Sequence, residues 1–452
     1  MHVTQQLAEF VRSRRPAPPA PEAREAALRC LLDLLASAAA GFPVPAAVAA
    51  RRAAPALFRA GTASVWFAGQ SLSAAGAAFC NAAAASALDL DDGNRLARGH
   101  PGAAVIPAAL ATAEDTGADA EALLAAIVTG YDVAIAVAAE RGFYARSGLW
   151  CGYGAVAAAA ALRRTPADRL AHALAISGMT APDLLSVADG TPYPPSLGND
   201  VKEGIPWATA TALAALELAE AGSCGPLDLL DHAPHHRAAG IFARLAGPPA
   251  VAATYFKFHC CCRHIHAPIE ALLAVMADHS LPPQAIDAVE VHTYRGAFNL
   301  SNRVAPANLV DVQYSIPYCL GLIALEGAEA LLPLEESVVH RPEVTAFARK
   351  VSLHLDPAID SRFPAESLAR IVVTTGGGRF SSRLTHPRGE AFEPPSWQEF
   401  GDKFSLASGR FLGSADRKAM LAAIGELRQG RLAPLRDLLH TDPGTISPHG
   451  QE

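Results

Sequence analysis

The sequence predicts a mainly α-helical protein, in which a large all-helical domain is joined to a smaller domain of mixed helices and strands. Three observations predict this fold class. Alanine-rich segments with apolar residues at helical spacing fill most of the chain before about residue 248. Strand-like segments are found almost only after that point. Helix-like sequence then returns near residue 395.

The overall composition is that of a soluble globular protein with a large core. The chain has 452 residues, of which 51% are hydrophobic and 18% are charged, and this length predicts two or three structural units. No strongly apolar stretch is long enough for a membrane span, so we expect no membrane association. The net charge of −7, without a dense Lys/Arg stripe, argues against a nucleic-acid partner. Eight cysteines, three of them consecutive, do not look like a secreted disulfide framework, so we expect a cytoplasmic protein with free thiols.

In the first half of the chain, nearly all the expected elements are helices. After a proline-rich arm at 14–23, the segment "EAREAALRCLLDLLASAAAGF" places leucines at helical spacing and ends near Gly41. The segment 73–90 predicts a second helix that runs into an acidic cluster, and further helices follow as far as 205–222. Only "ASVWFAG" (63–69) reads as a strand. The many small side chains suit closely packed helices.

The second half predicts strands at 287–294, 368–378 and 380–389, the last two forming a hairpin around Gly376–Gly378. Helical pieces lie between these strands. We therefore place a mixed α+β domain at residues 249–394, a size within the usual range for domains. The all-helical domain is expected to consist of residues 1–248 and 395–452, with the C-terminal helices packing back onto the first half.

Four polar groupings stand out from this apolar background. They are Asp89, Asp91, Asp92 and His100; Lys202, just before a long helix; Lys257, His259, Cys260–Cys262, Arg263, His264 and His266; and Tyr314, Ser315 and Tyr318. A lysine at a helix start can hold an anion together with the N-terminal amides. The third grouping suits a cationic pocket with a thiol for proton transfer.

Each grouping also has a purely structural interpretation. Aspartates can cap a helix or lie in a solvated loop, and Tyr318 can be a packed aromatic with a satisfied hydroxyl. The three histidines of "DHAPHHR" (231–237) read as a polar loop rather than a ligand set. Zinc is an alternative for the cysteine–histidine stretch. Its spacing argues against zinc, because three consecutive cysteines cannot all point at one ion and no second pair lies at C-x-x-C distance.

Four motifs in register resemble the MmgE/PrpD family, which includes 2-methylcitrate dehydratase, cis-aconitate decarboxylase and iminodisuccinate epimerase. The motifs are "SALDLDD" with "HPGAAVIPAALATAE", the Asp200–Lys202 pair before a helix, "YFKFHCCCRHIH", and "YSIPYCLGLIALEG". The resemblance covers about residue 5 to about residue 440. It implies a helical domain built from both chain ends, an inserted α+β lid domain, a site between them, and a homodimer.

The resemblance also implies a chemistry, which is proton movement at a carbon next to a carboxylate of a small di- or tricarboxylate. His100 matches the family's active-site histidine, and Asp89 and Asp91 would orient it or hold its charged form. The resemblance implies further catalytic residues at Lys202, Tyr318 and Cys262. The substrate contacts expected with it are Lys257, Arg263, His264, His266 and Tyr144. No metal or organic cofactor is implied.

Two departures from the family pattern bear on the reaction. Tyr144 stands where a family histidine is expected, and a second family histidine falls near Cys262. If neighbouring cations lower the pKa of the Cys262 thiol, it would suit an epimerase. The sequence thus leaves open a 2-methylcitrate dehydratase-like lyase, an epimerase of an amino-dicarboxylate such as iminodisuccinate, a non-catalytic carboxylate-binding homologue, and, less favoured, a zinc-dependent hydrolase.

Overall fold

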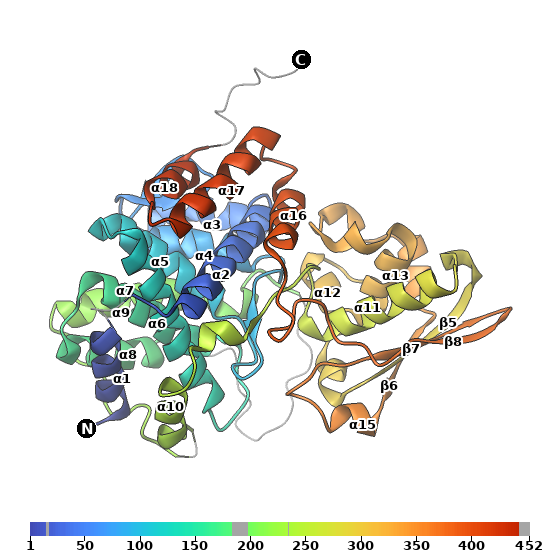
Figure 1. The fold of residues 1–452 in the computed structure, drawn as a ribbon, viewed down its shortest axis with the longest axis horizontal. Coiled ribbons are helices and arrows are strands. Elements are labelled where there is room, and N and C mark those ends of the chain that lie inside the picture. The colour runs from blue at the N-terminus through green and yellow to red at the C-terminus, as the bar shows by residue number, and fades with distance from the viewer. Residues whose placement is uncertain (15–17, 183–197, 234, 443–452) are drawn as a thin grey trace.

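The computed structural model describes residues 1–14, 18–182, 198–233 and 235–442, and these form two lobes (Figure 1). The predicted mainly helical fold class is confirmed. We call the larger part the helical lobe. Its helices are α1 (Val3–Arg14), α2 (Pro21–Gly41), α3 (Pro45–Leu57), α4 (Ala74–Ser86), α5 (Gly102–Thr116), α6 (Ala120–Ala139), α7 (Cys151–Arg163), α8 (Ala167–Met179), α9 (Ile205–Glu220) and α10 (Ala238–Leu245), with α16 (Trp397–Ser408), α17 (Ser414–Arg428) and α18 (Ala433–His440) from the C-terminal part.

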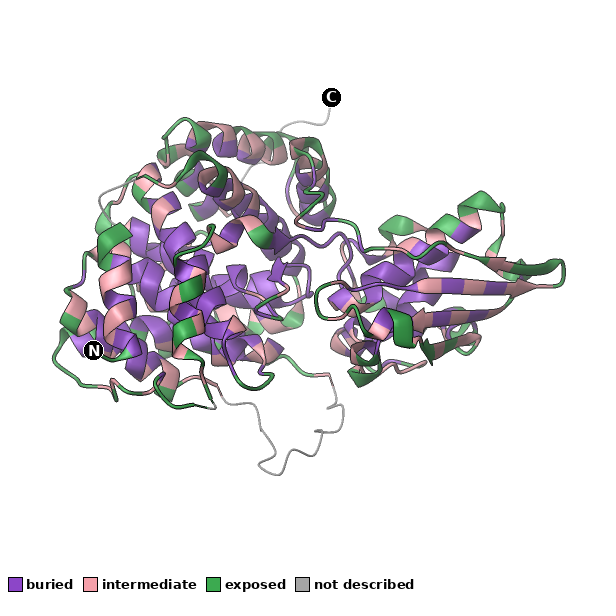
Figure 2. Cartoon of the chain, turned by 60° about the horizontal axis from the view of Figure 1, so that its bottom comes forward, coloured by how far each residue is buried: buried purple, intermediate pink, exposed green. Residues whose placement is uncertain are grey.

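The core of the helical lobe consists of helices whose backbones lie unusually close together. Helices α5, α6 and α7 pack against one another, and α4 and α9 cover them. A Cβ atom on Gly154 of α7 would lie 2.5 Å from the carbonyl oxygen of Gly130 on α6, so the contact needs glycine at this point. Alanine at the surrounding positions lets the other helices approach in the same way, and Figure 2 shows the lobe buried throughout its centre.

Helix α6 is long and apolar enough to span a membrane by length and composition alone. Of its most apolar 18-residue window, 83% is buried inside the protein. A helix that is apolar on all sides is also what the centre of a large soluble core requires.

Two small sheets supplement these helices. The strand expected at 63–69 is present as β1 (Ala63–Val65), which pairs antiparallel with β2 (Gln70–Leu72). The sequence did not indicate the second sheet, in which β3 (Gly93–Asn94) pairs with β4 (Thr254–Tyr255). This pairing ties the loop after the acidic cluster to the segment that leads into the second lobe.

The second, mixed lobe packs helices on one four-stranded sheet. Its elements are α11 (Arg263–Asp278), β5 (Ile286–Thr293), α12 (Leu309–Gln313), α13 (Ile316–Glu326), α14 (Pro342–Ala348), β6 (Val351–Leu355), α15 (Pro357–Asp360), β7 (Arg370–Thr375) and β8 (Gly378–Ser381). The strand order is β6-β5-β7-β8, and only the β5–β6 pair is parallel. Buried residues alternate along β5 and β7 because α11 covers one face of the sheet. The predicted hairpin is the β7–β8 pair.

The C-terminal helices pack back on the helical lobe, with α16 against α2 (Figure 1). A fully buried ion pair fixes this contact: Lys403 Nζ lies 2.5 Å from Asp33 Oδ1 and donates to the carbonyl of Leu90 at 3.1 Å. The second bond connects the C-terminal helices to the acidic loop of the site. All eight cysteines are free thiols.

Candidate active site

The acidic loop follows α4 and carries three buried aspartates, Asp89, Asp91 and Asp92, which are 3%, 1% and 1% exposed. Asp89 has a φ of 53°, in the left-handed region that non-glycine residues rarely adopt. Buried carboxylates are costly unless each has a partner. The structure provides a different partner for each of the three.

Asp92 is a structural anchor. Its Oδ2 accepts the hydroxyl proton of Tyr131 at 2.5 Å, and its Oδ1 accepts the amide of Gly102 at 3.1 Å. A Cβ on Gly102 would lie 2.6 Å from Asp92 Oδ1, so glycine is required at the start of α5. Burial raises the pKa of Asp92 to about 7. This carboxyl therefore holds the loop against α5 and α6.

Asp89 forms a buried ion pair with Lys257. The ammonium donates to Asp89 Oδ1 at 2.6 Å and to the Asp89 carbonyl at 2.7 Å, and the lysine side chain is fully buried. Burial alone would raise the pKa of Asp89, but the charges of Lys257, Lys202 and His100 hold it well below its usual value. Burial would lower the pKa of Lys257, and Asp89 and Asp91 raise it instead. Both groups are ionised.

His100 lies between two carboxylates. Its Nδ1 is 3.1 Å from Asp91 Oδ2 and 3.0 Å from the Asp92 carbonyl, while its Nε2 is 3.4 Å from Asp89 Oδ1. Burial lowers the pKa of His100, but Asp91 and Asp89 outweigh burial and raise it to about 9. The ring is therefore an imidazolium at neutral pH. We call Asp89, Asp91, His100 and Lys257 the charge cluster.

Lys202 approaches the charge cluster from a strained turn before α9. Lys202, Glu203 and Gly204 have consecutive positive φ angles of 44°, 58° and 76°. Such strain persists only where the surroundings enforce it, and it concentrates at functional sites. Glu203 enforces it here, because its Oε2 accepts both the amide (3.0 Å) and the hydroxyl (2.7 Å) of Ser147. The same Ser147 hydroxyl oxygen accepts the His100 amide at 3.1 Å.

The mixed lobe reaches the site through Gln313 and Tyr314. Gln313 Oε1 accepts from Lys202 Nζ at 2.7 Å, and its Nε2 donates to the Ala87 carbonyl at 3.1 Å. Lys202 Nζ also lies 5.4 Å from the centroid of the Tyr314 ring. Burial, together with Asp89 and Glu203, raises the pKa of Tyr314, so its phenol stays protonated. The sequence does not single out Gln313, and it indicates Tyr314 only as one member of the fourth polar grouping.

Cys262 caps α11 at the same junction, with its amide bonded to the Gln313 carbonyl at 2.9 Å. The expectation that cations lower the pKa of this thiol is wrong. Burial, reinforced by the negative charge of Asp89, raises the pKa of Cys262 to about 12. Lys257 acts in the opposite direction, but its charge is already paired with Asp89. The group is a neutral thiol.

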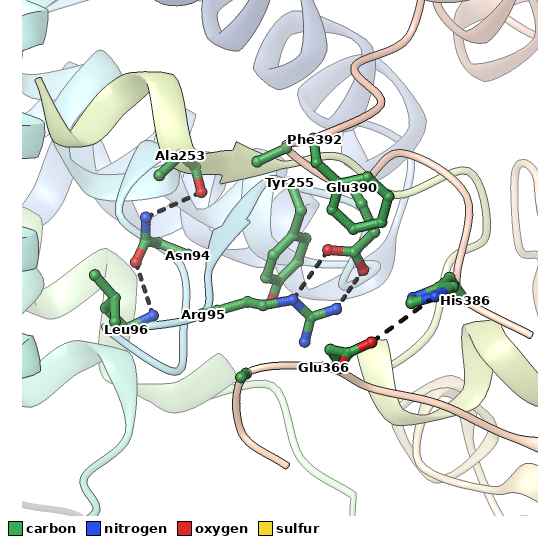
Figure 3. Close-up of a pocket in the computed structure, with 11 residues that line it drawn as sticks. Asn94, Arg95, Leu96, Ala253, Tyr255, Glu366, His386, Glu390 and Phe392 are labelled. Carbon is green, nitrogen blue, oxygen red and sulfur yellow. Dashed lines mark hydrogen bonds and ion pairs between the residues drawn. The ribbon is translucent and has the colours of Figure 1, made fainter. Parts of the chain in front are cut away.

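Arg263 belongs to a separate network that joins the two lobes. Its Nη2 donates to Glu390 Oε1 at 2.7 Å, and its Nη1 donates to the carbonyls of Phe256 and Arg388. Glu390 also pairs with Arg95 of the helical lobe, as Figure 3 shows. The structure thus places Arg263 in a network of hydrogen bonds and ion pairs between the lobes.

The remaining predicted residues lie at different distances from this chemistry. His264 Nδ1 lies within hydrogen-bond distance of the Tyr294 hydroxyl, at 2.6 Å. Burial lowers the pKa of His264 to about 4. His266 lies within α11 and is paired with the Cys261 carbonyl at 3.1 Å. Tyr144 is 62% exposed, and its ring lies 5.6 Å from the Arg98 guanidinium. Burial lowers the pKa of His266, and the charge of Lys257 contributes, so His266 lies near the charge cluster without a described hydrogen bond to it.

Tyr318 is also held away from the cluster by its own hydrogen bonds. Its hydroxyl donates to the Val338 carbonyl at 2.7 Å and accepts the Arg341 amide at 3.2 Å, inside the mixed lobe. We expect Tyr318→Phe to lower the free energy of unfolding by about 1–3 kcal/mol, because it leaves buried backbone groups unpaired. Activity should stay within twofold, measured by kcat on the same preparations. A loss of kcat without a loss of stability would place this hydroxyl in the reaction.

The charge cluster fits a metal ion poorly. Ligand atoms of Asp89, Asp91 and His100 lie within 4.8 Å of one another, close enough to hold an ion. The Lys257 ammonium, however, already lies 2.6 Å from Asp89 Oδ1. A divalent cation at this position would meet a buried positive charge at short range, which is strongly unfavourable.

The two lobes and the charge cluster between them define a mainly helical protein with buried, ionised side chains at a lobe junction. Residues 5–248 match the family model of the MmgE/PrpD N-terminal domain, and residues 259–427 match that of the MmgE/PrpD C-terminal domain. The chain belongs to the MmgE/PrpD family, as the four motifs predicted. This family is generally one of enzymes, dehydratases and their relatives. No match was found among curated proteins.

Proposed function

We propose that the protein is a cofactor-independent lyase that moves a proton next to a carboxylate of a small di- or tricarboxylate. The observation that carries this proposal is the position of His100, whose ring nitrogens lie 3.1 Å from Asp91 Oδ2 and 3.4 Å from Asp89 Oδ1; the two carboxylates raise its pKa to about 9. A buried imidazolium at the junction of two lobes is a proton donor held ready at neutral pH. Family membership supports a lyase of the dehydratase type.

Lys202 is the cation that we assign to the substrate carboxylate. An ammonium has three N–H donors. Among the described residues, Lys202 donates one of them to Gln313, which leaves donors for a substrate carboxylate. Lys257, which the sequence also suggested, is fully buried and paired with Asp89. In this scheme it affects the substrate only by keeping Asp89 ionised. As the proton next to the carboxylate leaves, negative charge grows on that carboxylate. The charges of Lys202 and His100 stabilise it there.

His100 supplies the proton that completes the reaction. In a dehydration, the ionised Asp89 carboxylate beside Nε2 takes the proton from carbon, while Nε2 delivers its own proton to the leaving hydroxyl, which departs as water. In a decarboxylation, carbon dioxide leaves, the electron pair of the broken bond stays on the carbon, and Nε2 delivers its proton there. Asp91 keeps the ring charged, and Asp89 orients its second nitrogen. Asp91 is a positioning residue in our scheme, as is Glu203, which fixes the loop that carries Ser147.

An epimerase remains the second candidate because Cys262 and His100 lie at the same junction. A two-base epimerase needs one of its two groups deprotonated. Here the thiol of Cys262 and the ring of His100 are both in their acid forms, since their pKa values are raised to about 12 and about 9. This electrostatic pattern favours the lyase.

The test is a proton NMR assay in D₂O with the full-length protein. The panel is citrate, 2-methylcitrate, cis-aconitate, malate and iminodisuccinate, and the control is His100→Gln. A product that has lost water or carbon dioxide, absent in the control, supports the lyase. Deuterium exchange without any such loss identifies the epimerase. No exchange or turnover with any compound would overturn the proposed function for this panel.

The role of Asp91 predicts a specific pH dependence. A reaction that needs protonated His100 loses rate as pH rises through the His100 pKa of about 9. In Asp91→Asn the largest cause of the raised pKa is gone, while burial and Lys257 still lower it. We expect the basic limb of the kcat/KM profile to move down by roughly one to three pH units. An unchanged limb would exclude Asp91 as the group that keeps the ring charged.

A further inference from the structure

The hydroxyl of Tyr314 is an unused hydrogen-bond donor at the lobe junction. The described contacts of Tyr314 involve its backbone groups and the face of its ring, and none involves the hydroxyl oxygen. The side chain is only partly buried. Its oxygen is also not among the unpartnered polar atoms that the described fold seals from solvent. The Tyr314 hydroxyl is therefore accessible to a ligand.

Lys202 holds its ammonium against the same tyrosine ring. Its Nζ lies 5.4 Å from the ring centroid, and its one described hydrogen bond goes to Gln313. Two of the three N–H donors of the ammonium are therefore left for a ligand. Because the hydroxyl of Tyr314 belongs to this ring, one small di- or tricarboxylate can contact both donors.

The charges around Tyr314 leave its hydroxyl as a donor only. Burial, together with the charges of Asp89 and Glu203, raises the pKa of Tyr314, so both carboxylates lie within electrostatic range of the phenol. The phenol stays neutral at the working pH. A hydrogen bond from a neutral donor to a carboxylate is roughly twice as strong as one between two neutral groups.

The preceding loop fixes the direction of the tyrosine ring. The Tyr314 carbonyl accepts the Asn302 amide at 3.0 Å and the Ser301 hydroxyl at 3.3 Å. Asn302 has a φ of 46°, in the left-handed region, and its Oδ1 accepts the Ile316 amide at 3.1 Å. These bonds hold the backbone on both sides of the ring. None of them uses the phenol, so a phenylalanine at position 314 would keep them all.

We propose that the Tyr314 hydroxyl and the Lys202 ammonium together bind one carboxylate of the substrate, the one next to the carbon that loses its proton. The inference rests on the proposed function and adds a substrate contact from the mixed lobe to that from the helical lobe. As the proton leaves carbon, negative charge grows on this carboxylate and the hydrogen bond from Tyr314 strengthens. The phenol keeps its own proton throughout.

The first experiment is NMR of the full-length protein with tyrosine labelled with ¹³C at the hydroxyl-bearing carbon, whose chemical shift reports hydrogen bonding. The probes are succinate and tricarballylate, which lack a leaving hydroxyl, and succinamide as the uncharged counterpart. Tyr314→Phe identifies the signal of interest. Tyr318→Phe identifies the matched control, because the Tyr318 hydroxyl is already paired inside the mixed lobe. Lys202→Met tests whether the two donors act on one carboxylate.

We expect at least one of the two acids to shift the Tyr314 signal and to leave the Tyr318 signal in place. In Lys202→Met, at least about tenfold more acid should be needed for the same shift, the size expected when a charged hydrogen bond is lost. A Tyr314 signal that neither acid moves, or that succinamide moves equally, would overturn the proposal. An equal affinity in Lys202→Met would also overturn it.

The second experiment compares kcat and KM of Tyr314→Phe and Tyr318→Phe. Tyr314→Phe should lower kcat about 10²–10³-fold, the usual effect of removing one donor to a developing negative charge, with a much smaller change in KM. Its urea midpoint should match that of the wild-type protein, because the ring remains over Lys202. An unchanged kcat would overturn the proposal.

The two experiments also separate this inference from the proposed function. Turnover of the substrate panel by a protein whose Tyr314 signal never shifts would overturn the Tyr314 contact and leave the lyase standing. A Tyr314 shift without turnover of any compound would support the carboxylate site, while the proposed lyase would fail for that panel.

Discussion

Replacing Lys257 by Met is expected to lower the free energy of unfolding by about 3–5 kcal/mol, because Asp89 is then a buried carboxylate without its partner. The ammonium is fully buried and lies 2.6 Å from Asp89 Oδ1. Activity should fall at least a hundredfold, since the burial of Asp89 then favours its neutral form and the orientation of His100 is lost. Urea denaturation and kcat on the same preparation measure the two effects.

The double variant Lys257→Met with Asp89→Leu separates stability from activity. Removing both charges of a buried pair is often neutral for stability, so most of the lost free energy should return. Activity should not return, because the carboxylate beside Nε2 of His100 is missing. If Lys257→Met alone were as stable as the wild-type protein, the ion pair would not compensate the burial of Asp89.

His100→Gln is expected to lower kcat/KM by about 10²–10⁴-fold, the usual contribution of a general acid. Glutamine keeps a hydrogen-bond donor near Asp91 but cannot transfer a proton. Binding of the substrate carboxylate should change much less, because Lys202 is intact. The comparison uses initial rates and calorimetric binding with the substrate that the NMR panel identifies. Activity within tenfold of the wild-type protein would remove His100 from the reaction.

Much of the fold was predictable because the helical and strand periodicities are long and clear. The α2 helix ends at Gly41 as expected, and the β7–β8 hairpin turns at the glycines. The β6 strand, "VSLHL" at 351–355, was missed because it is a short edge strand with little burial to create a pattern. The β3–β4 pair was missed for another reason: it joins two dipeptides that are far apart in the chain.

The site was predictable at the level of motifs but not of partners. Three aspartates in one loop look alike in sequence, yet Asp89 pairs with Lys257 and Asp92 with Tyr131. These partners come from distant segments, so only the fold assigns them. The sequence shows a cation at Arg263, but it does not show that this cation forms an ion pair with Glu390.

The two tyrosines of the fourth motif show the same limit. Ser315 caps α13 and its oxygen accepts the Tyr318 amide, which places Tyr318 in the first turn with its hydroxyl inside the mixed lobe. Tyr314, just before the cap, lies beside Lys202 instead. A Ser followed by Pro at the second helical position was the sequence signal for this boundary. This signal places the helix start at Ser315. It therefore predicts that Tyr314 lies outside the helix and Tyr318 lies in its first turn.

The central claim is that two carboxylates hold His100 as a proton donor at neutral pH. The most direct test is an NMR titration of the protein with ¹³C-labelled histidine, in which the His100 signal is identified by its absence from His100→Gln. We predict that the ring titrates with a pKa of about 9, and that Asp91→Asn titrates well below it. A wild-type ring that titrates at or below the ordinary histidine value of about 6.5 would contradict the claim.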